Sequence, residues 1–209
     1  MIKKQYIVRD FSLHVKANEK IGVIGRIGCG KSSVLKTLLR LQCFHRGKIL
    51  LGGVDLSEIS TEQLRNSVKY VGQTPKLFNR SLLENITLGK PYTQDPIQIL
   101  RDAGLNDVAD EFQSRLNDPV GKYGSKLSGG QCQIVCLLRL AMDPGNVIIL
   151  DEPTSAMDER SRDQIMKLIV FITKNVTMFL ITHDKTLLKF VDRVVTMKNG
   201  ELAHDQRSR

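Results

Sequence analysis

The sequence predicts an α/β protein with a mainly parallel β-sheet, a small antiparallel β part and an inserted helical subdomain. Short β-rich runs alternate with helical patterns in the first and last parts of the chain, which favours parallel strands joined by helices. A glycine-rich turn connects one strand to a helix, and strand signals are missing between residues 77 and 127. We therefore predict one domain of residues 1–209, with a core of residues 1–76 and 143–209 and a helical subdomain of residues 77–142.

Three strands and one helix are predicted in the first part of the core. The apolar run Lys20–Gly25 predicts a strand that enters the glycine-rich turn, and Ser32–Leu41 has the apolar spacing of a helix. Lys48–Leu51 predicts a short strand ended by a glycine pair, and Val68–Gly72 predicts another.

The inserted region is predicted to be helical. Ser81–Thr87 and Pro96–Ala103 show short helical patterns, separated by proline and glycine breaks. A longer helix is predicted at Gly129–Met142, and the Asp-Pro-Gly sequence of residues 143–145 ends it.

The last part of the chain returns to alternating strands and helices. Strand Val147–Leu150 is followed by helix Glu159–Lys174 and strand Val176–Ile181. A short helix then leads to strand Arg193–Met197, and the Asn-Gly pair of residues 199–200 predicts a turn.

A phosphate-binding motif lies in the glycine-rich turn. Its pattern, G-x-x-x-x-G-K-[ST], stands between a predicted strand and a predicted helix, as the chemistry requires. The glycines let successive backbone N–H groups point at phosphate oxygens, Lys31 is expected to reach the β- and γ-phosphates, and Ser32 to bind Mg²⁺. The motif predicts a P-loop NTPase (RecA-like) core. The predicted nucleotide-binding residues here are Gly25, Arg26, Ile27, Gly28, Cys29, Gly30, Lys31, Ser32 and Ser33.

Two acids follow the buried strand that begins at Val147. Asp151 is expected at the carboxyl edge of the sheet, where it can hold Mg²⁺ through water. Glu152 is expected to accept the proton of the attacking water. The alternative is that both acids only stabilise a helix N-terminus.

The composition is that of a globular, basic protein. Hydrophobic residues make up 41%, charged residues 25%, and the net charge is +9, without a basic tract. We expect the basic charge to serve binding of anionic nucleotides beside a membrane, and we expect no nucleic-acid partner. Nucleic-acid binding is the alternative. No run approaches ~20 apolar residues, and no signal-peptide core is recognised near the start, so we expect an intracellular protein. The four cysteines form no CxxC pair, and we expect reduced thiols.

A second glycine pair, in the segment 127–131, begins the predicted helix Gly129–Met142. Alone it could be only a helix cap. Together with the two motifs above, it resembles the signature of the ABC ATPase family, over nearly the whole chain. Three more segments match in order: Gln73 resembles the Q-loop glutamine, residues 155–158 the D-loop, and His183 the switch histidine.

The resemblance implies a Mg²⁺-dependent ATPase with ATP as its nucleotide. Its catalytic residues would be Lys31, Gln73, Glu152 and His183, and its metal site would use Ser32, Gln73 and Asp151. It also implies a head-to-tail dimer, in which the signature of one domain caps the ATP held by the other. The signature residues are Ser128, Gly129, Gly130 and Gln131.

The resemblance further implies a transporter motor at the cytoplasmic face of a membrane, working with a fused or separate transmembrane domain. Segments 77–79, 84–89 and 120–124 resemble exporters rather than importers. A soluble, non-transport ABC ATPase and a truncated cassette with impaired nucleotide binding are the alternatives.

Four positions depart from the family pattern. The family's adenine-stacking aromatic would fall before Met1, and Tyr6 is the nearest candidate. Lys122 stands where exporters often have glutamate, Cys132 replaces a frequent basic residue, and Asn18 replaces a usual glycine. Within the phosphate loop, we expect that alkylation of the cysteine at position 29 blocks ATP binding and that ATP protects the thiol. The alternative is that this cysteine is only an inert small residue.

Overall fold

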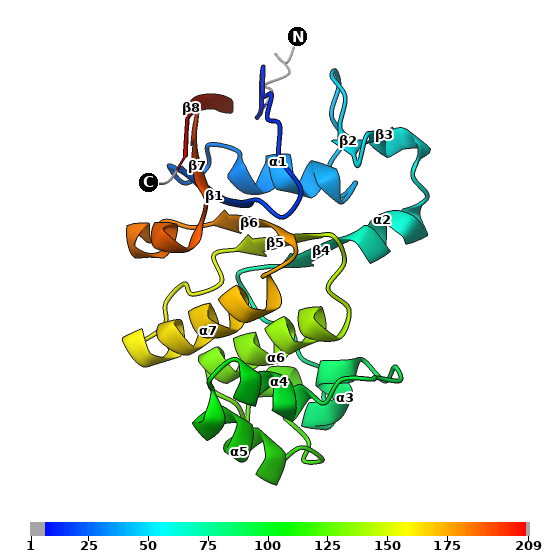
Figure 1. Ribbon diagram of the computed structural model, residues 1–209, viewed down its shortest axis with the longest axis vertical. Helices are drawn as coiled ribbons and strands as arrows, with labels where there is room; N and C mark the ends of the chain where they lie inside the picture. Colours follow the sequence, from blue (N-terminus) through cyan, green and yellow to red (C-terminus); the bar gives the residue numbers. More distant parts are fainter. Residues whose placement is uncertain (1–6, 208–209) are drawn as a thin grey trace. The chain divides into compact units, whose positions relative to one another are not determined.

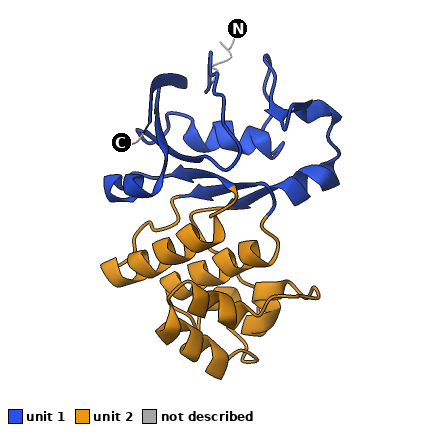
Figure 2. Ribbon diagram, in the orientation of Figure 1, with its two compact units in different colours: residues 1–70, 145–151, 177–209 blue, residues 71–144, 152–176 orange. Residues whose placement is uncertain are grey.

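The computed structural model describes residues 7–207. The chain divides into two compact units (Figure 2). Unit 1 comprises residues 1–70, 145–151 and 177–209, and unit 2 comprises residues 71–144 and 152–176. Unit 2 therefore holds residues 152–176 in addition to the helical segment predicted for 77–142, and the predicted subdomain boundaries stay a prediction.

Unit 1 is built on a six-stranded sheet with the strand order β4-β5-β6-β1-β7-β8. β1 pairs in parallel with β6 and β7, β5 pairs in parallel with β6, and β8 runs antiparallel to β7. This mainly parallel sheet confirms the predicted fold class. The strands are β1 Lys20–Gly25, β4 Val68–Val71, β5 Val147–Asp151, β6 Thr177–Ile181, β7 Arg193–Lys198 and β8 Glu201–Arg207.

The centre of this sheet is apolar on both faces. All five residues of β5 and all five of β6 are buried, as expected of strands covered on both sides. Helix α1, Lys31–Leu38, begins directly after the glycine-rich turn and lies on one side of the sheet (Figure 1). Leu35 of α1 joins Ile21, Val23 and Ile149 of the sheet in one apolar core. The turn between β1 and α1 is thereby anchored at both ends.

A short hairpin and a helix follow α1. β2, Leu50–Leu51, pairs antiparallel with β3, Val54–Asp55, and forms the small antiparallel sheet. The 3₁₀ helix η1, Leu56–Glu58, then leads to helix α2, Thr61–Ser67, which the apolar spacing did not predict. Ser60 and Gln63 form a capping box at its start, and this sequence signal could have located the helix.

Strand β8 was also missed by the sequence reading. Its residues are mostly polar and exposed, because it is an edge strand paired on one side only. The turn before it places Asn199 at φ 53° and Gly200 at φ 83°, and Asn-Gly is the strongest short hairpin signal. The 3₁₀ helix η3, Lys185–Phe190, connects β6 to β7.

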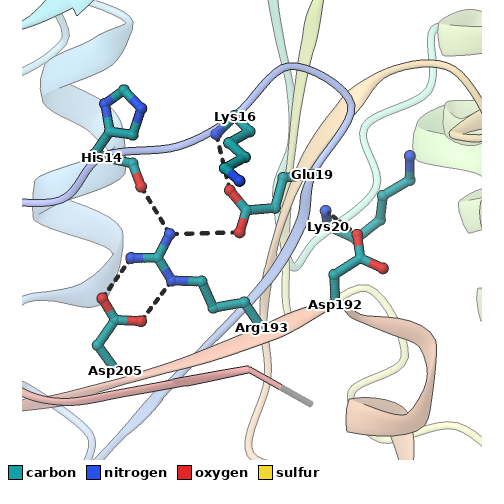
Figure 3. A network of polar contacts seen from close by, with 7 residues as sticks. All are labelled: His14, Lys16, Glu19, Lys20, Asp192, Arg193 and Asp205. Atoms are coloured by element: carbon teal, nitrogen blue, oxygen red, sulfur yellow. Dashed lines mark hydrogen bonds and ion pairs between the residues drawn. The ribbon is translucent and has the colours of Figure 1, made fainter. Parts of the chain in front are cut away.

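An ionic network joins this hairpin to the segment before β1 (Figure 3). Arg193 on β7 donates to both carboxylate oxygens of Asp205 on β8. Its guanidinium also donates to the backbone carbonyl of His14, at 2.7 Å, and contacts Glu19 at 3.4 Å. The hydrogen bonds to Asp205 and Glu19 raise the pKa of Arg193. The network ties the β7–β8 hairpin to the segment before β1, which is far away in sequence.

Unit 2 consists of helices packed around α6. α6 contacts α3, α4 and α7, and nine of its fourteen residues are buried, which makes it the central element. Arg139 of α6 donates to the backbone carbonyls of Lys76 and Asn85 and so ties α6 to the segment before α3. Among residues 7–207, no helix is long and apolar enough to cross a membrane. The helices are α3 Leu82–Thr87, α4 Pro96–Asp102, α5 Asn106–Ser114, the 3₁₀ helix η2 Lys122–Gly124, α6 Gly129–Met142 and α7 Glu159–Ile172.

Candidate nucleotide site

The predicted phosphate loop connects β1 to α1 and curls through left-handed backbone. Gly28 and Gly30 have φ values of 80° and 102°, which residues with a side chain rarely adopt. At Gly25, a Cβ atom would lie well inside 3.0 Å of the Met197 carbonyl oxygen and 2.8 Å from the Cys29 sulfur. The loop therefore packs against β7 so closely that only glycine fits at position 25.

Lys31 lies at the start of α1, inside the curled loop. Its side chain is buried, and Nζ donates to the carbonyl oxygens of Gly25 at 2.8 Å and Arg26 at 3.2 Å. Nζ also lies 3.5 Å from Nε2 of His183. The loop thus surrounds one positive charge at a helix N-terminus, an arrangement that attracts phosphate.

The sheet topology explains why His183 lies beside the loop. β6 is the parallel neighbour of β1, and Ile181 is aligned with Val23, so both strands end at the same edge. The backbone continues this pairing, because the Thr182 N–H donates to the Val23 carbonyl at 3.3 Å. His183 is the next residue and is exposed at this edge. The structure thus brings the predicted Lys31 and His183 together.

Asp151 ends β5 at the same edge of the sheet. It is aligned with Ile181 of β6, which is in turn aligned with Val23 of β1. The Asp151 side chain is buried, and the hydroxyl of Tyr70 on β4 donates to its Oδ2 at 2.9 Å. Burial, and then the hydrogen bond to Asp151, raise the pKa of Tyr70, so the hydroxyl stays protonated as a donor.

Tyr70 is a site residue that the sequence reading missed. Its position next to Asp151 depends on β4 being adjacent to β5, and the two strands are separated by 75 residues of intervening chain, 72 to 146. The only signal in the sequence is a tyrosine near the end of a predicted strand, which carries no information about its neighbour.

The oxygen donors at this edge fit Mg²⁺, a hard cation that prefers oxygen ligands. Ser32 and Ser33 lie half-buried in the first turn of α1, and Asp151 ends β5. Within residues 7–207, no group of three or more His, Cys, Asp or Glu side chains could hold a metal ion. Mg²⁺ bound with substrate phosphates uses one or two carboxylates and keeps several waters.

Glu152 starts the segment of unit 2 that follows β5. Its φ is 53°, in the left-handed region, which costs about 1–2 kcal/mol for a residue with a side chain. Its carbonyl accepts a hydrogen bond from the Ser155 N–H at 3.2 Å, so the chain turns directly after the strand. Left-handed residues of this kind cluster at functional sites.

Gln73 and the D-loop-like segment meet within unit 2. Nε2 of Gln73 donates to the hydroxyl of Ser155 at 3.2 Å. Both residues were singled out by the sequence, Gln73 as a site residue and Ser155 as the first of the 155–158 segment. Their contact joins two of the predicted motifs directly.

The signature residues form the N-terminus of α6. Ser128 and Gln131 make a capping box, with the Gln131 N–H donating to the Ser128 hydroxyl at 3.1 Å and the Ser128 N–H to Gln131 Oε1 at 2.9 Å. Gly130 is buried against Ser161 of α7, whereas Ser128 and Gly129 are exposed. The helix cap, which was the alternative interpretation of this glycine pair, is therefore present. Ser128 and Gly129 are still exposed to solvent.

Cys29 does not face outward with the tip of its loop. Ile27 is 90% exposed, but the Cys29 side chain is 8% exposed and belongs to the apolar core of unit 1. Burial in the core protects a thiol from reagents. We therefore expect alkylation of Cys29 to be slow in the folded chain.

The structure places three of the family departures, and Tyr6 lies outside the described residues. Asn18 adopts φ 62°, and asparagine tolerates the left-handed region that favours glycine. Lys122 Nζ lies 5.5 Å from the centroid of the Tyr123 ring. Cys132 is buried, its sulfur lies 3.7 Å from the Gly124 carbonyl, and burial raises the pKa of its thiol.

The loop, the enclosed lysine and the buried aspartate at one sheet edge define a P-loop ATPase domain. The family model described as ABC transporter matches residues 8–155. The chain belongs to the ABC transporter family, and the predicted class, an ATPase of the ABC type, is confirmed.

Curated relatives include ATP-binding proteins that are named for toxin translocation. The alpha-hemolysin translocation ATP-binding protein HlyB of Escherichia coli O157:H7 is 37% identical over 201 residues, covering 95% of this chain and 28% of the relative. The leukotoxin translocation ATP-binding protein LktB of Mannheimia glucosida is 35% identical over 198 residues, again covering 28% of the relative. The chain therefore spans less than a third of the length of these proteins.

A solved structure extends the likeness to three dimensions. A bacterial Atm1-family ABC exporter with ATP bound matches with a TM-score of 0.88 and 26% identity. The match covers 98% of this chain and 36% of the exporter chain. The fold is therefore that of the ATP-binding part of an ABC exporter.

Proposed function

We propose that this chain is the motor domain of an ABC exporter, which binds and hydrolyses ATP with Mg²⁺ and works as a head-to-tail pair. The observation that carries the proposal is the shared sheet edge where the Lys31 ammonium, His183 and Asp151 lie. The relatives and the solved exporter support the export function.

The residues of unit 1 would bind the triphosphate. The loop N–H groups and Lys31 would hold the β- and γ-phosphates, since a buried ammonium inside a curled loop is a strong anion site. Ser32 and Asp151 would hold Mg²⁺, which when bound neutralises charge on the phosphates. His183, next to Lys31, would contact the γ-phosphate.

The residues of unit 2 would supply the proton acceptor and the partner contacts. Glu152 would take a proton from the attacking water, because a carboxylate directly after the metal-binding strand end is suited to this role. Gln73 would bind the metal through its amide oxygen, while its Nε2 holds Ser155. Ser128, Gly129 and the α6 N-terminus would cap ATP held by a second copy.

A transmembrane domain, fused or separate, would be coupled to ATP binding and hydrolysis by this chain at the cytoplasmic face of a membrane. The chain matches less than a third of HlyB and LktB, whose printed names describe translocation. The segments 77–79 and 120–124, which resemble those of exporters, support the same direction of transport. ATP would close the pair and hydrolysis would reopen it, which converts chemical energy into two states of a transporter.

The proposal is tested by the Mg²⁺-dependent ATPase rate as a function of protein concentration. The parent rate should rise faster than linearly, because two copies build each site. Glu152→Gln should abolish hydrolysis while ATP binding persists, since the amide cannot accept the proton. A strictly linear rate would contradict the paired motor, and an active Glu152→Gln variant would contradict Glu152 as the proton acceptor.

A further inference from the structure

Tyr70 is the one described side chain that donates a side-chain hydrogen bond to the strand-end aspartate. Its hydroxyl lies 2.9 Å from Asp151 Oδ2, a normal O–H···O distance. The Asp151 side chain is 8% exposed, so its carboxylate depends on protein partners more than a surface acid does. Tyr70 belongs to no motif that the sequence analysis singled out.

The rest of the tyrosine is held by its own neighbours. Its ring packs against the apolar core of unit 1, and Nζ of Lys36 on α1 lies 6.0 Å from the ring centroid. β4, which carries the tyrosine, is the neighbour of β5 in the sheet. The hydroxyl is therefore presented to Asp151 by a ring that is fixed independently of the carboxylate.

A carboxylate offers two oxygens, and its rotation decides which of them meets a ligand. An ionised aspartate only accepts hydrogen bonds, and the Tyr70 hydroxyl engages Oδ2. A fixed Oδ2 also fixes the direction of Oδ1. Partners of this kind orient metal ligands and are needed for full metal affinity.

We propose that Tyr70 is a positioning residue for magnesium, whose hydroxyl orients the Asp151 carboxylate toward the Mg²⁺–ATP bound by the phosphate loop. The inference rests on the proposed function, in which Asp151 holds Mg²⁺. Tyr70 itself touches neither the nucleotide nor the metal in this assignment.

The hydroxyl can be removed without the ring by Tyr70→Phe. The variant keeps the packing against the core and the contact with Lys36, and it loses the hydrogen bond to Asp151. We expect the Mg²⁺ concentration for half-maximal ATPase rate to rise about tenfold, as for other partners of metal ligands. At saturating Mg²⁺ the maximal rate should recover, because the reacting groups are untouched.

Metal binding should be measured directly as well. Mn²⁺ binding to the chain with a non-hydrolysable ATP analogue, followed by electron paramagnetic resonance, reports affinity without turnover. The Tyr70→Phe variant should bind Mn²⁺ more weakly, and metal-free binding of the analogue should match the parent. Tyr92→Phe, which removes a hydroxyl in unit 2 from a side chain that is 48% exposed, is the matched control and should leave both values unchanged.

Asp151→Asn distinguishes a failure of the positioning role of Tyr70 from a failure of Asp151 as a metal ligand. If Asp151→Asn weakens Mn²⁺ binding and Tyr70→Phe does not, the positioning role is overturned and the proposed function stands. If neither does, Asp151 is not a metal ligand and the proposed function loses its metal site. A loss of unfolding free energy in Tyr70→Phe with unchanged Mn²⁺ affinity would show a merely structural hydroxyl and would also overturn the proposal.

Discussion

Two helices of this chain have glycine at or just before their first residue, and both belong to predicted ATP contacts, yet their N-termini are built differently. α1 starts after Gly30, at φ 102°, and no side chain of the described residues caps it. α6 starts after Ser128, whose hydroxyl accepts the Gln131 N–H in a capping box. The first helix leaves its N–H groups to a ligand, whereas the second already satisfies one of its own.

The two helix ends also differ in how far away their supports lie. The cap of α6 comes from residues three apart in sequence. The phosphate loop before α1 is supported by the β7–β8 hairpin, because the Gly200 N–H donates to the Cys29 carbonyl at 3.1 Å and Gly25 packs on Met197. A local capping box therefore shapes the signature, whereas long-range contacts with the β7–β8 hairpin shape the phosphate loop.

Gly200→Ala should break the long-range support and give the largest effect. Its φ is +83°, and a Cβ atom would overlap the Ile7 carbonyl oxygen and lie 2.9 Å from the Ile7 carbonyl carbon. The left-handed backbone and this overlap together should lower the free energy of unfolding by about 2–4 kcal/mol. ATP affinity should fall as well, because the hairpin turn moves away from Cys29. Urea denaturation and equilibrium nucleotide binding measure the two effects.

Gly53→Ala is the matched control for this prediction. Gly53 has nearly the same φ, +85°, but a Cβ there would meet nothing within 4 Å. It should therefore show only the backbone cost of about 1 kcal/mol and normal ATP binding. Equal losses in the two variants would mean that the close approach of Gly200 to Ile7 adds nothing to the backbone cost.

The same contrast explains which parts of the molecule the sequence could predict. The bounds of α6, Gly129–Met142, agree with the prediction because its cap and its stop signal are local. The strands of the buried sheet and the phosphate loop were likewise predicted from local patterns. The capping box at Ser60 was overlooked, although it is also a local signal.

The contacts that sequence reading missed are those that depend on strand order. Tyr70 meets Asp151 only because β4 is adjacent to β5, and the apolar periodicity of a strand says nothing about its neighbour. β8 was missed for a different reason, since an edge strand needs no apolar face and its polar sequence resembles a loop. Elements marked by local motifs were therefore predictable, and the contacts between neighbouring strands were not.

Ser128→Ala should test the capping box of α6 and give a smaller effect than Gly200→Ala. Loss of the cap should lower the free energy of unfolding by about 1 kcal/mol. ATP binding by the isolated chain should stay unchanged, because the phosphate loop has its own supports. The ATPase rate at high protein concentration should fall, since the exposed hydroxyl is proposed to contact ATP of a second copy.

Ser60→Ala provides the matched comparison, because Ser60 heads a capping box of the same kind on α2. It should show a similar loss of stability without a change in the concentration dependence of the rate. If both variants lowered the rate equally, the effect of Ser128→Ala would be explained by stability alone.

Asp205→Asn should test the ionic network that holds the hairpin (Figure 3) and give the smallest effect. The hydrogen bond from Arg193, and then its charge, hold the pKa of Asp205 below its ordinary value of 3.8. A lowered native pKa stabilises the fold above pH 3.8, and this contribution is lost as the pH falls through the native value. The parent should exceed the variant by about 0.5–1 kcal/mol at pH 7, and the difference should shrink in acid.

The matched control is Asp107→Asn, which removes one partner of a more exposed ion pair with Arg160 in unit 2. Exposed pairs contribute little, so this variant should follow the parent at every pH. Urea denaturation between pH 3 and pH 7 measures both. A pH-independent difference for Asp205→Asn would attribute its role to packing rather than charge, and the hairpin would then support the phosphate loop through backbone contacts alone.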